Sequence, residues 1–341
     1  MELESKSPCV KVPPRQAEEA RRLLKKLGLY NEELKMKRGG STIALPVVEP
    51  VEAVERLRES GVEASPCTGE FETVRRVKRL SSAIKSFRQV GDIAVFSQTH
   101  GVPYEEYRKA AEELLAVNPR IRSVWLKRET VGLERVAGLV HLAGDRVTRT
   151  IVKEYGVRFY VDISKAYYNP RLASEHHRVA QLVEDGEMVL DMFTGIGGFP
   201  LHIATARRAL TVGVDLNIDA LELAAESLKL NKSRLKGTVV YINADARSLP
   251  GILRGVFDRV IMNLPKSSVE FLDAACKLVR NGGVIHVYVI SGDESGARRI
   301  IEDTMAKHGC TAYIVNVKRV LDYSPGHAIY VVDARVARRG G

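Results

Sequence analysis

The sequence predicts an α/β protein whose C-terminal half forms one mainly parallel sheet of seven strands. From residue 183 onward strand-like and helix-like segments alternate, and alternating βαβ units build parallel, doubly wound sheets. Two strand-like segments follow one another at the end, which indicates a hairpin and therefore one antiparallel strand at the sheet edge. The preceding residues predict two smaller α/β domains, so we expect domains over 1–65, 70–157 and 158–341.

The smaller domains are predicted from the period of apolar residues and from turn residues. In the first domain we expect helices over 16–29 and 50–60 and a strand over 41–48. The stretch 65–69 contains Ser, Pro and Gly and is interpreted as a flexible linker. In the second domain we expect a helix over 103–116 and strands over 92–97, 123–128 and 149–161.

In the large domain, helices are expected over 199–206, 218–230, 268–279 and 295–308. Strands are expected over 188–191, 210–215, 239–242, 259–262, 284–290, 311–320 and 328–332. A sheet with this terminal hairpin differs from the six-stranded parallel sheet of dehydrogenases. It is typical of the Rossmann-like sheet of methyltransferases.

Composition narrows the class of protein. With 45% hydrophobic and 28% charged residues, the 341-residue chain can bury a sizeable core and is not a disordered tail. Its apolar runs are too short for a membrane span, and the N-terminus has no apolar signal core, so we expect a cytoplasmic protein with no membrane partner. The cysteines show no CxxC spacing, so we expect reduced thiols and no metal site: Cys9, Cys67, Cys276 and Cys310.

The net charge of +10 suggests a polyanionic partner, and its distribution is uneven. Residues 1–70 carry 12 Lys/Arg and 12 Asp/Glu, whereas residues 71–150 carry 15 and 9. A solvated helix face would look similar, so charge alone leaves RNA binding open. The excess is densest in a segment that includes Arg75, Arg76, Lys78, Arg79, Lys85 and Arg88.

A strand runs into a glycine-rich turn at residues 189–198, VLDMFTGIGG, and then into a helix. Asp191 precedes the glycines, whereas a dinucleotide site would read GxGxxG and face a pyrophosphate. S-adenosylmethionine has no phosphate and carries an ammonium and a sulfonium, so a carboxylate suits it. Asp191, Asp215 and Asp245 each follow a predicted strand. Any one of them alone could be only a helix cap, but three acids on successive strand ends of one sheet favour this cofactor. We predict that it is bound by Asp191, Phe193, Gly195, Gly197, Asp215, Leu216, Asp245, Ala246 and Asn263.

Two further groups predict contacts with a base. Asn263 begins an Asn-x-Pro loop after the fourth strand, and its amide can both donate to and accept from a base edge. Residues 167–175 place aromatics beside an Arg and an acid, which could stack a flipped base and handle its proton. A strand-to-helix turn and an exposed helix start are the alternative interpretations. The predicted substrate-binding residues are Tyr167, Arg171, His176, Pro265 and Lys266.

Four motifs in this order resemble the archaeal–eukaryotic tRNA guanine-37 N1-methyltransferases: VDISKAYYNPRLASEH, DMFTGIGGFP, GVDLN and IMNLPK. The resemblance covers the chain, since KKLGLYNEELK is similar to the family's first domain and HLAGDRVTRTIVKEYG to the end of its second. It implies a small domain that reads the tRNA elbow, a linking domain and a seven-stranded cofactor domain. We therefore expect tRNA as the partner of a monomeric enzyme.

The resemblance also implies catalytic roles. Glu175 matches the general base, Arg135 the arginine that steadies the guanine 6-oxo group, and Asn263 the residue that orients the target. The chemistry agrees, because nitrogen 1 must lose a proton and the neighbouring oxygen then gains charge. The chain departs from the family pattern at His176, where related sequences often carry Arg, and in NPRL, where SPRL is common.

Three other functions remain open at this point. A wyosine-pathway enzyme could methylate carbon 7 of the tricyclic precursor, alone or as a second activity, or transfer the aminocarboxypropyl arm, although arm-transferring relatives lack NLPK. An NAD(P)-dependent oxidoreductase is disfavoured by the missing GxGxxG and by the terminal hairpin. A non-catalytic RNA-binding protein would need no row of acids on strand ends.

Overall fold

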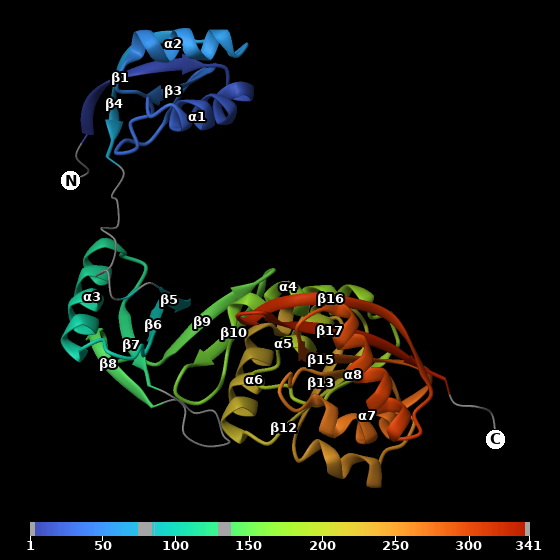
Figure 1. Ribbon diagram of the computed structural model, residues 1–341. Coiled ribbons are helices and arrows are strands. Elements are labelled where there is room, and N and C mark those ends of the chain that lie inside the picture. Colours follow the sequence, from blue (N-terminus) through green and yellow to red (C-terminus); the bar gives the residue numbers. More distant parts are fainter. Residues whose placement is uncertain (1–3, 74–83, 85, 129–137, 338–341) are drawn as a thin grey trace. The chain divides into compact units, whose positions relative to one another are not determined.

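The computed structural model describes residues 4–73, 84, 86–128 and 138–337 (Figure 1). The chain divides into two compact units, Met1–Leu80 and Ser81–Gly341. The predicted α/β class is confirmed in both. Within the described ranges, no helix is long and apolar enough to cross a membrane.

The first unit is a four-stranded antiparallel sheet in the order β2-β3-β1-β4 with two helices. Its buried core brings together Leu24 and Leu57 from the helices and Leu45 from the sheet. The elements are β1 (Glu4–Val12), α1 (Ala17–Lys26), β2 (Lys37–Gly39), β3 (Thr42–Pro46), α2 (Pro50–Glu59) and β4 (Ser65–Glu72).

The linker predicted at 65–69 is wrong, because these residues lie in β4. This strand pairs antiparallel with β1, from Ser65 opposite Lys11 to Glu72 opposite Glu4. It is an edge strand, where proline and glycine are tolerated, so Pro66 and Gly69 gave a misleading loop signal. The first compact unit therefore includes β4, through Glu72.

The prediction of reduced thiols is also contradicted. Cys9 of β1 lies directly opposite Cys67 of β4, and the two form a disulfide. A second disulfide joins Cys276 to Cys310. Both pairs are distant in sequence and are brought together by strand register and helix packing, which local cysteine spacing does not reveal.

The second unit begins with a four-stranded sheet, β5-β6-β7-β8, and one helix. The elements are β5 (Phe87–Val90), β6 (Ile93–Ser97), α3 (Tyr104–Val117), β7 (Ser123–Lys127) and β8 (Leu139–Gly144). A two-stranded hairpin follows, β9 (Arg149–Glu154) and β10 (Val157–Asp162), where one strand was predicted. Tyr155 and Gly156 form its turn, both with positive φ (45° and 90°), as a two-residue type I′ turn requires.

This hairpin is hydrogen-bonded to the large domain. The backbone amide of Tyr160 donates to Ser227 Oγ (2.9 Å), and that of Arg158 donates to Asn231 Oδ1 (3.0 Å). Both acceptors belong to the segment around α6 (Ile218–Leu230). The predicted boundary between residues 157 and 158 therefore falls inside a hairpin that packs on the large domain.

The large sheet has the strand order β13-β12-β11-β14-β15-β17-β16. Strands β11 to β15 are parallel, and β17 lies between β15 and β16 and is antiparallel to both. The strands are β11 (Met188–Asp191), β12 (Leu210–Asp215), β13 (Thr238–Asn243), β14 (Phe257–Met262), β15 (Val279–Ser291), β16 (Ala312–Ser324) and β17 (His327–Val336).

Helices cover both faces of this sheet because alternate residues of each strand point to opposite sides. Leu190 joins a core with residues of α7 (Leu272–Leu278) and α8 (Glu294–Lys307). Val189, its neighbour in β11, joins another core with α4 (Ala173–Leu182) and α5 (Gly198–Ala206). Short 3-10 helices span Pro14–Gln16, Pro170–Leu172, Lys232–Arg234, Ala246–Gly251 and Ser268–Phe271.

Candidate cofactor and substrate site

The acids predicted from the sequence lie at one edge of the large sheet. Asp191 ends β11 opposite Gly213, and Asp215 ends β12 opposite Asn243. Asp245 follows β13 by two residues, and Asn263 directly follows β14. Ligands of open α/β sheets bind outside the carboxyl ends of the strands, where these four side chains lie.

The glycine turn is packed on one side and open on the other. Gly195 and Gly197 both have positive φ, 51° and 84°. A Cβ atom on Gly197 would lie 2.3 Å from the Tyr241 hydroxyl, whereas one on Gly195 would meet nothing within 4 Å. The open side at Gly195 therefore leaves room for a ligand to approach the backbone.

These two glycines predict different mutant behaviour. Gly197→Ala should lower stability by more than about 1 kcal/mol, because it combines the φ cost with a clash against Tyr241. Gly195→Ala has the same kind of φ cost but no clash, so it should lower cofactor affinity more than stability. Thermal unfolding and calorimetric titration with S-adenosylhomocysteine measure the two effects; equal losses of stability would contradict this assignment.

Asp191 is buried behind the glycine turn with one carboxylate oxygen unpartnered. Its Oδ1 accepts from the Phe193 amide at 3.3 Å. Its Oδ2, together with the hydroxyls of Thr194 and Tyr241, has no hydrogen-bond partner among the described residues. Burial raises the pKa of Asp191 to about 7 and also raises the pKa of Tyr241. Since an unsatisfied buried polar group costs about 1–3 kcal/mol, a cationic ligand with N–H donors fits this position.

Asp215 holds the glycine turn in place. Its two oxygens accept from the amides of Gly195 (2.7 Å) and Asn217 (2.9 Å). Leu216 beside it is exposed. Asp245 is paired with Arg247, whose hydrogen bond to the carboxylate lowers the pKa of Asp245. Asp215 therefore both shapes the turn and presents a carboxylate at the sheet edge.

The loop after β14 is shaped by a residue that the sequence analysis missed. Ser268 Oγ donates to the Met262 carbonyl at 2.9 Å and accepts from the Leu264 amide at 3.3 Å. Within the described chain, the half-buried side chain of Asn263 makes no hydrogen bond. The Lys266 ammonium lies 5.9 Å from the centre of the Tyr323 ring. Ser268 thus fixes the loop and leaves the Asn263 amide available.

Glu175 lies at the start of α4 and is only 2% exposed. Both of its oxygens accept from Arg178, at 2.7–3.0 Å, and Oε1 also accepts from the Tyr288 hydroxyl at 2.7 Å. Arg178 in turn donates to Asp333 at 3.2 Å. These three partners were not predicted from the sequence. Arg135 lies outside the described residues.

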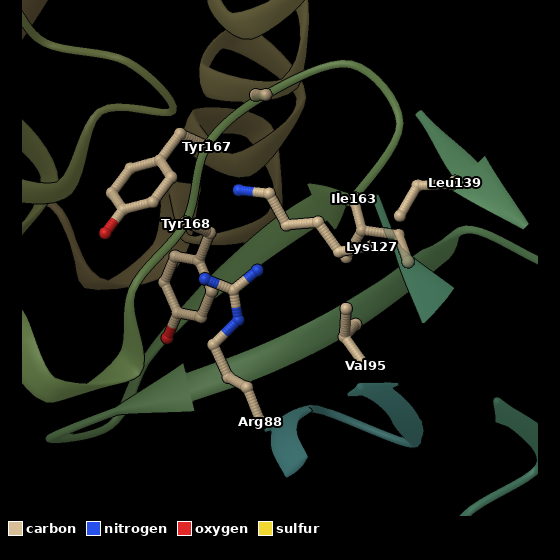
Figure 2. A pocket seen from close by; sticks show the side chains of 8 residues that line it. Arg88, Val95, Lys127, Leu139, Ile163, Tyr167 and Tyr168 are labelled. Atoms are coloured by element: carbon tan, nitrogen blue, oxygen red, sulfur yellow. The ribbon is translucent and has the colours of Figure 1, made fainter. Parts of the chain in front are cut away.

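Residues 167–176 divide between the surface and the interior. Tyr167 is 50% exposed and lines a pocket with Arg88 and Lys127. Figure 2 shows both basic side chains extending toward the tyrosines, with the Arg88 guanidinium 5.9 Å from the Tyr167 ring centre. The surface part of this segment therefore combines an aromatic ring with positive charge.

The structure places the side chain of His176, a predicted substrate contact, in the interior rather than at the surface. Its ring is buried and lies against Glu154, with Nδ1 at 2.8 Å from the carboxylate, whereas Arg171 is exposed. The reason is the helical period: His176 follows Glu175 on the inward side of α4 and packs against Gly198 of α5.

Comparison with known proteins identifies the family. Residues 150–313 match the TRM5/TYW2 methyltransferase domain, and residues 9–55 match the tRNA methyltransferase 5 N-terminal domain. The chain is 33% identical to the tRNA (guanine(37)-N(1))-methyltransferase Trm5b of Pyrococcus abyssi, over 96% of this chain and 99% of that protein. A crystal structure of Pyrococcus abyssi Trm5b superimposes with a TM-score of 0.71 at 30% identity, over 97% and 100% of the two chains.

A wyosine-pathway relative covers less of the chain. The tRNA 4-demethylwyosine(37)-methyltransferase Taw21 of Saccharolobus solfataricus is 31% identical over 63% of this chain and 81% of its own length.

A solved complex of aTrm5 with tRNALeu covers nearly the whole chain. It matches with a TM-score of 0.68 at 28% identity, over 96% of this chain and 99% of that one. Together with the site geometry, these matches show that the chain belongs to the TRM5/TYW2 methyltransferase family.

Proposed function

We propose that the chain transfers the methyl group of S-adenosylmethionine to ring nitrogen 1 of guanine 37 in tRNA. The observation that carries this proposal is the extent of the match. Trm5b relatives align over 96–97% of the chain, including the N-terminal domain, whereas Taw21 aligns over 63%. In this assignment the protein acts as a monomer with three parts: residues 1–72, the linking sheet, and the hairpin with the large domain.

The residues at the sheet edge fit the cofactor. Bound S-adenosylmethionine supplies an activated methyl group. The Asp191 carboxylate, with its unpartnered oxygen, suits the ammonium, and the Asp215 carboxylate suits the ribose hydroxyls. In this arrangement Asp245 and Ala246 lie beside the adenine ring of the cofactor. The open space at Gly195 lets the cofactor approach the protein backbone.

The target base would lie between Asn263 and the segment that carries Tyr167. Asn263 orients its edge, and Tyr167, with Arg88 and Lys127 nearby, offers a stacking ring and charge for phosphates. Glu175 removes the proton from nitrogen 1 and Arg135 stabilises the negative oxygen. Arg178 and Tyr288 already donate hydrogen bonds to the Glu175 carboxylate. The N–H group at nitrogen 1 of guanine must therefore replace one of these donors before Glu175 can take its proton.

Nucleoside mass spectrometry tests the proposal. After incubation of the protein with S-adenosylmethionine and a tRNA carrying guanine 37, we expect 1-methylguanosine at that position and none in the matched tRNA with adenine 37. A second tRNA that carries 4-demethylwyosine at position 37 tests the alternative, which the similarity to Taw21 over 63% of the chain favours. Methylation of only the second tRNA would overturn the proposal.

Cofactor affinity should depend on pH through Asp191. The pKa of about 7 means that the buried carboxyl is protonated below this pH, so it offers no negative charge to the cofactor ammonium. The dissociation constant for S-adenosylhomocysteine should therefore fall by up to about tenfold per pH unit as the pH rises toward 7, then level off. Calorimetry between pH 5 and 8 measures this. Asp191→Asn should bind weakly without this slope, and an unchanged slope would assign the titration to another group.

Removing the first domain should reduce tRNA discrimination rather than chemistry. The deletion must extend through residue 73, because a cut at 65 would leave β4 without its partner β1. The shortened protein should still bind cofactor and methylate abundant tRNA, since the predicted catalytic residues lie beyond it. Residues 1–70 carry no net charge, so the salt dependence should change little.

A competition between intact tRNA and tRNA with a disrupted elbow measures this discrimination. The full-length protein should prefer the intact tRNA, and the shortened protein should methylate both at similar rates. Equal preference in the two proteins would leave the first domain with only a structural role.

A further inference from the structure

Away from the sheet edge, three buried side chains with metal-binding atoms face one another. They are Glu154 of β9, His176 of α4 and His202 of α5, with exposures of 4%, 7% and 2%. Glu154 Oε2 lies 2.8 Å from His176 Nδ1 and 3.1 Å from His202 Nε2. The three ligand atoms all lie within 4.8 Å of one another, and no other such group occurs in the described part of the chain.

The donor set and its spacing suit a transition-metal ion. Two imidazole nitrogens and one carboxylate oxygen, with a fourth position left open, form a common zinc coordination. Metal–ligand bonds of about 2.0–2.1 Å in a tetrahedron place ligand atoms about 3.3 Å apart. The distances of 2.8 and 3.1 Å from Glu154 are shorter than that value by up to about 0.5 Å, and the ligand atoms all lie within 4.8 Å of one another, so the three side chains must shift to take an ion.

The negative charge of Glu154 also favours binding of a metal ion. This carboxylate is buried, and no Lys or Arg among the described residues forms an ion pair with it. Both imidazole nitrogens contact the same oxygen, Oε2, which is the carboxylate atom that a metal ion would bind. The carboxylate adds a negatively charged oxygen ligand to the two nitrogens, as divalent transition metals prefer.

The surroundings orient the ligands as in a metal site. The Tyr168 hydroxyl donates to Glu154 Oε1 at 2.7 Å, which fixes the carboxylate. The rings of Phe199 and Phe159 pack on His176 and His202, with centroids at 4.7 and 5.8 Å. Tyr155, 60% exposed, has its ring 6.3 Å from that of His202 and lies between the cluster and solvent.

We propose that Glu154, His176 and His202 bind one divalent transition-metal ion, of which Zn²⁺ is the best match to the donors. The ion would link the β9–β10 hairpin to α4 and α5. Helix α4 carries Glu175, and helix α5 follows the glycine turn. The proposal does not depend on the nature of the methylated base.

Zinc binding by the full-length protein, freed of any affinity tag and stripped with a chelator, tests the proposal. Calorimetric titration with Zn²⁺ should show one equivalent bound and a higher melting temperature. Glu154→Gln and His202→Asn should each weaken zinc affinity by at least about 100-fold, since each removes one of three ligands. His308→Asn is the matched control, because His308 is exposed at the end of α8 and is not part of the cluster, so the change should leave the affinity unchanged.

A second measurement keeps the test decisive if a ligand variant does not fold. Zinc-edge X-ray absorption of the wild-type protein with one equivalent of Zn²⁺ should show nitrogen and oxygen ligands at about 2.0–2.1 Å and the scattering pattern of two imidazoles. The absence of stoichiometric binding, unchanged affinity in His202→Asn, or a zinc spectrum without imidazole ligands would each overturn the proposal. The cluster would then be a metal-free hydrogen-bonded contact.

Discussion

Glu175→Gln is expected to slow single-turnover methyl transfer by roughly 10²–10⁴-fold, the range for losing a general base. The amide cannot accept the proton from nitrogen 1, whereas its shape and position are nearly those of the acid. Affinity for tRNA and for S-adenosylhomocysteine should stay close to the wild-type values, because neither ligand is held mainly by this side chain in the proposed arrangement.

A matched variant separates chemistry from structure. Tyr288→Phe removes one hydrogen bond to the same carboxylate, at 2.7 Å, without removing the carboxylate. It should lower stability by about 1 kcal/mol and keep most of the rate. If Glu175 only anchors α4 through Arg178, both variants should lose stability and neither should lose much rate. A normal single-turnover rate in Glu175→Gln would mean that another group removes the proton.

Arg135→Ala should reduce the single-turnover rate by about 10²–10³-fold, because the variant lacks the guanidinium proposed to stabilise the charge that develops on the guanine oxygen. The ground-state base carries little charge there, so tRNA affinity should change far less than the rate. Arg146→Ala is the control. It removes one positive charge from an exposed position within residues 71–150, the basic part of the chain that also contains Arg135. It should weaken tRNA binding slightly and leave the rate of the bound complex unchanged. Equal rate losses in both variants would point to a general electrostatic effect.

The parallel strands and the helices between them could be predicted from the sequence because their signals are local. α6 was predicted at residues 218–230, where the structure has it, and the Asn217 side chain caps its first turn by accepting from the Ala220 amide at 3.2 Å. The strands β11 and β12 are short apolar runs that each end in an aspartate. Once their order is parallel, the acids must meet at one edge.

Features that depend on distant residues could not be predicted. β1 was missed because Ser7 and Pro8 interrupt its apolar pattern, although Val10 and Val12 are fully buried. The partners of Glu175 illustrate the same limit, since Tyr288 lies 113 residues further along the chain. The metal-binding triad likewise comes from three elements, with no short spacing among 154, 176 and 202. Such contacts follow from sheet order and helix packing rather than from any local pattern.

The position of β17 in the sheet has a consequence for protein synthesis. This strand, His327–Val336, lies between β15 and β16, so a nascent chain that has not yet released it from the ribosome cannot complete the sheet. Asp333 on the same strand anchors Arg178. The N-terminal unit can fold as soon as it emerges, as domains generally do during translation. The predicted catalytic centre must wait for the last strand, so a ribosome that stalls late would leave a folded first domain attached to an inactive catalytic half.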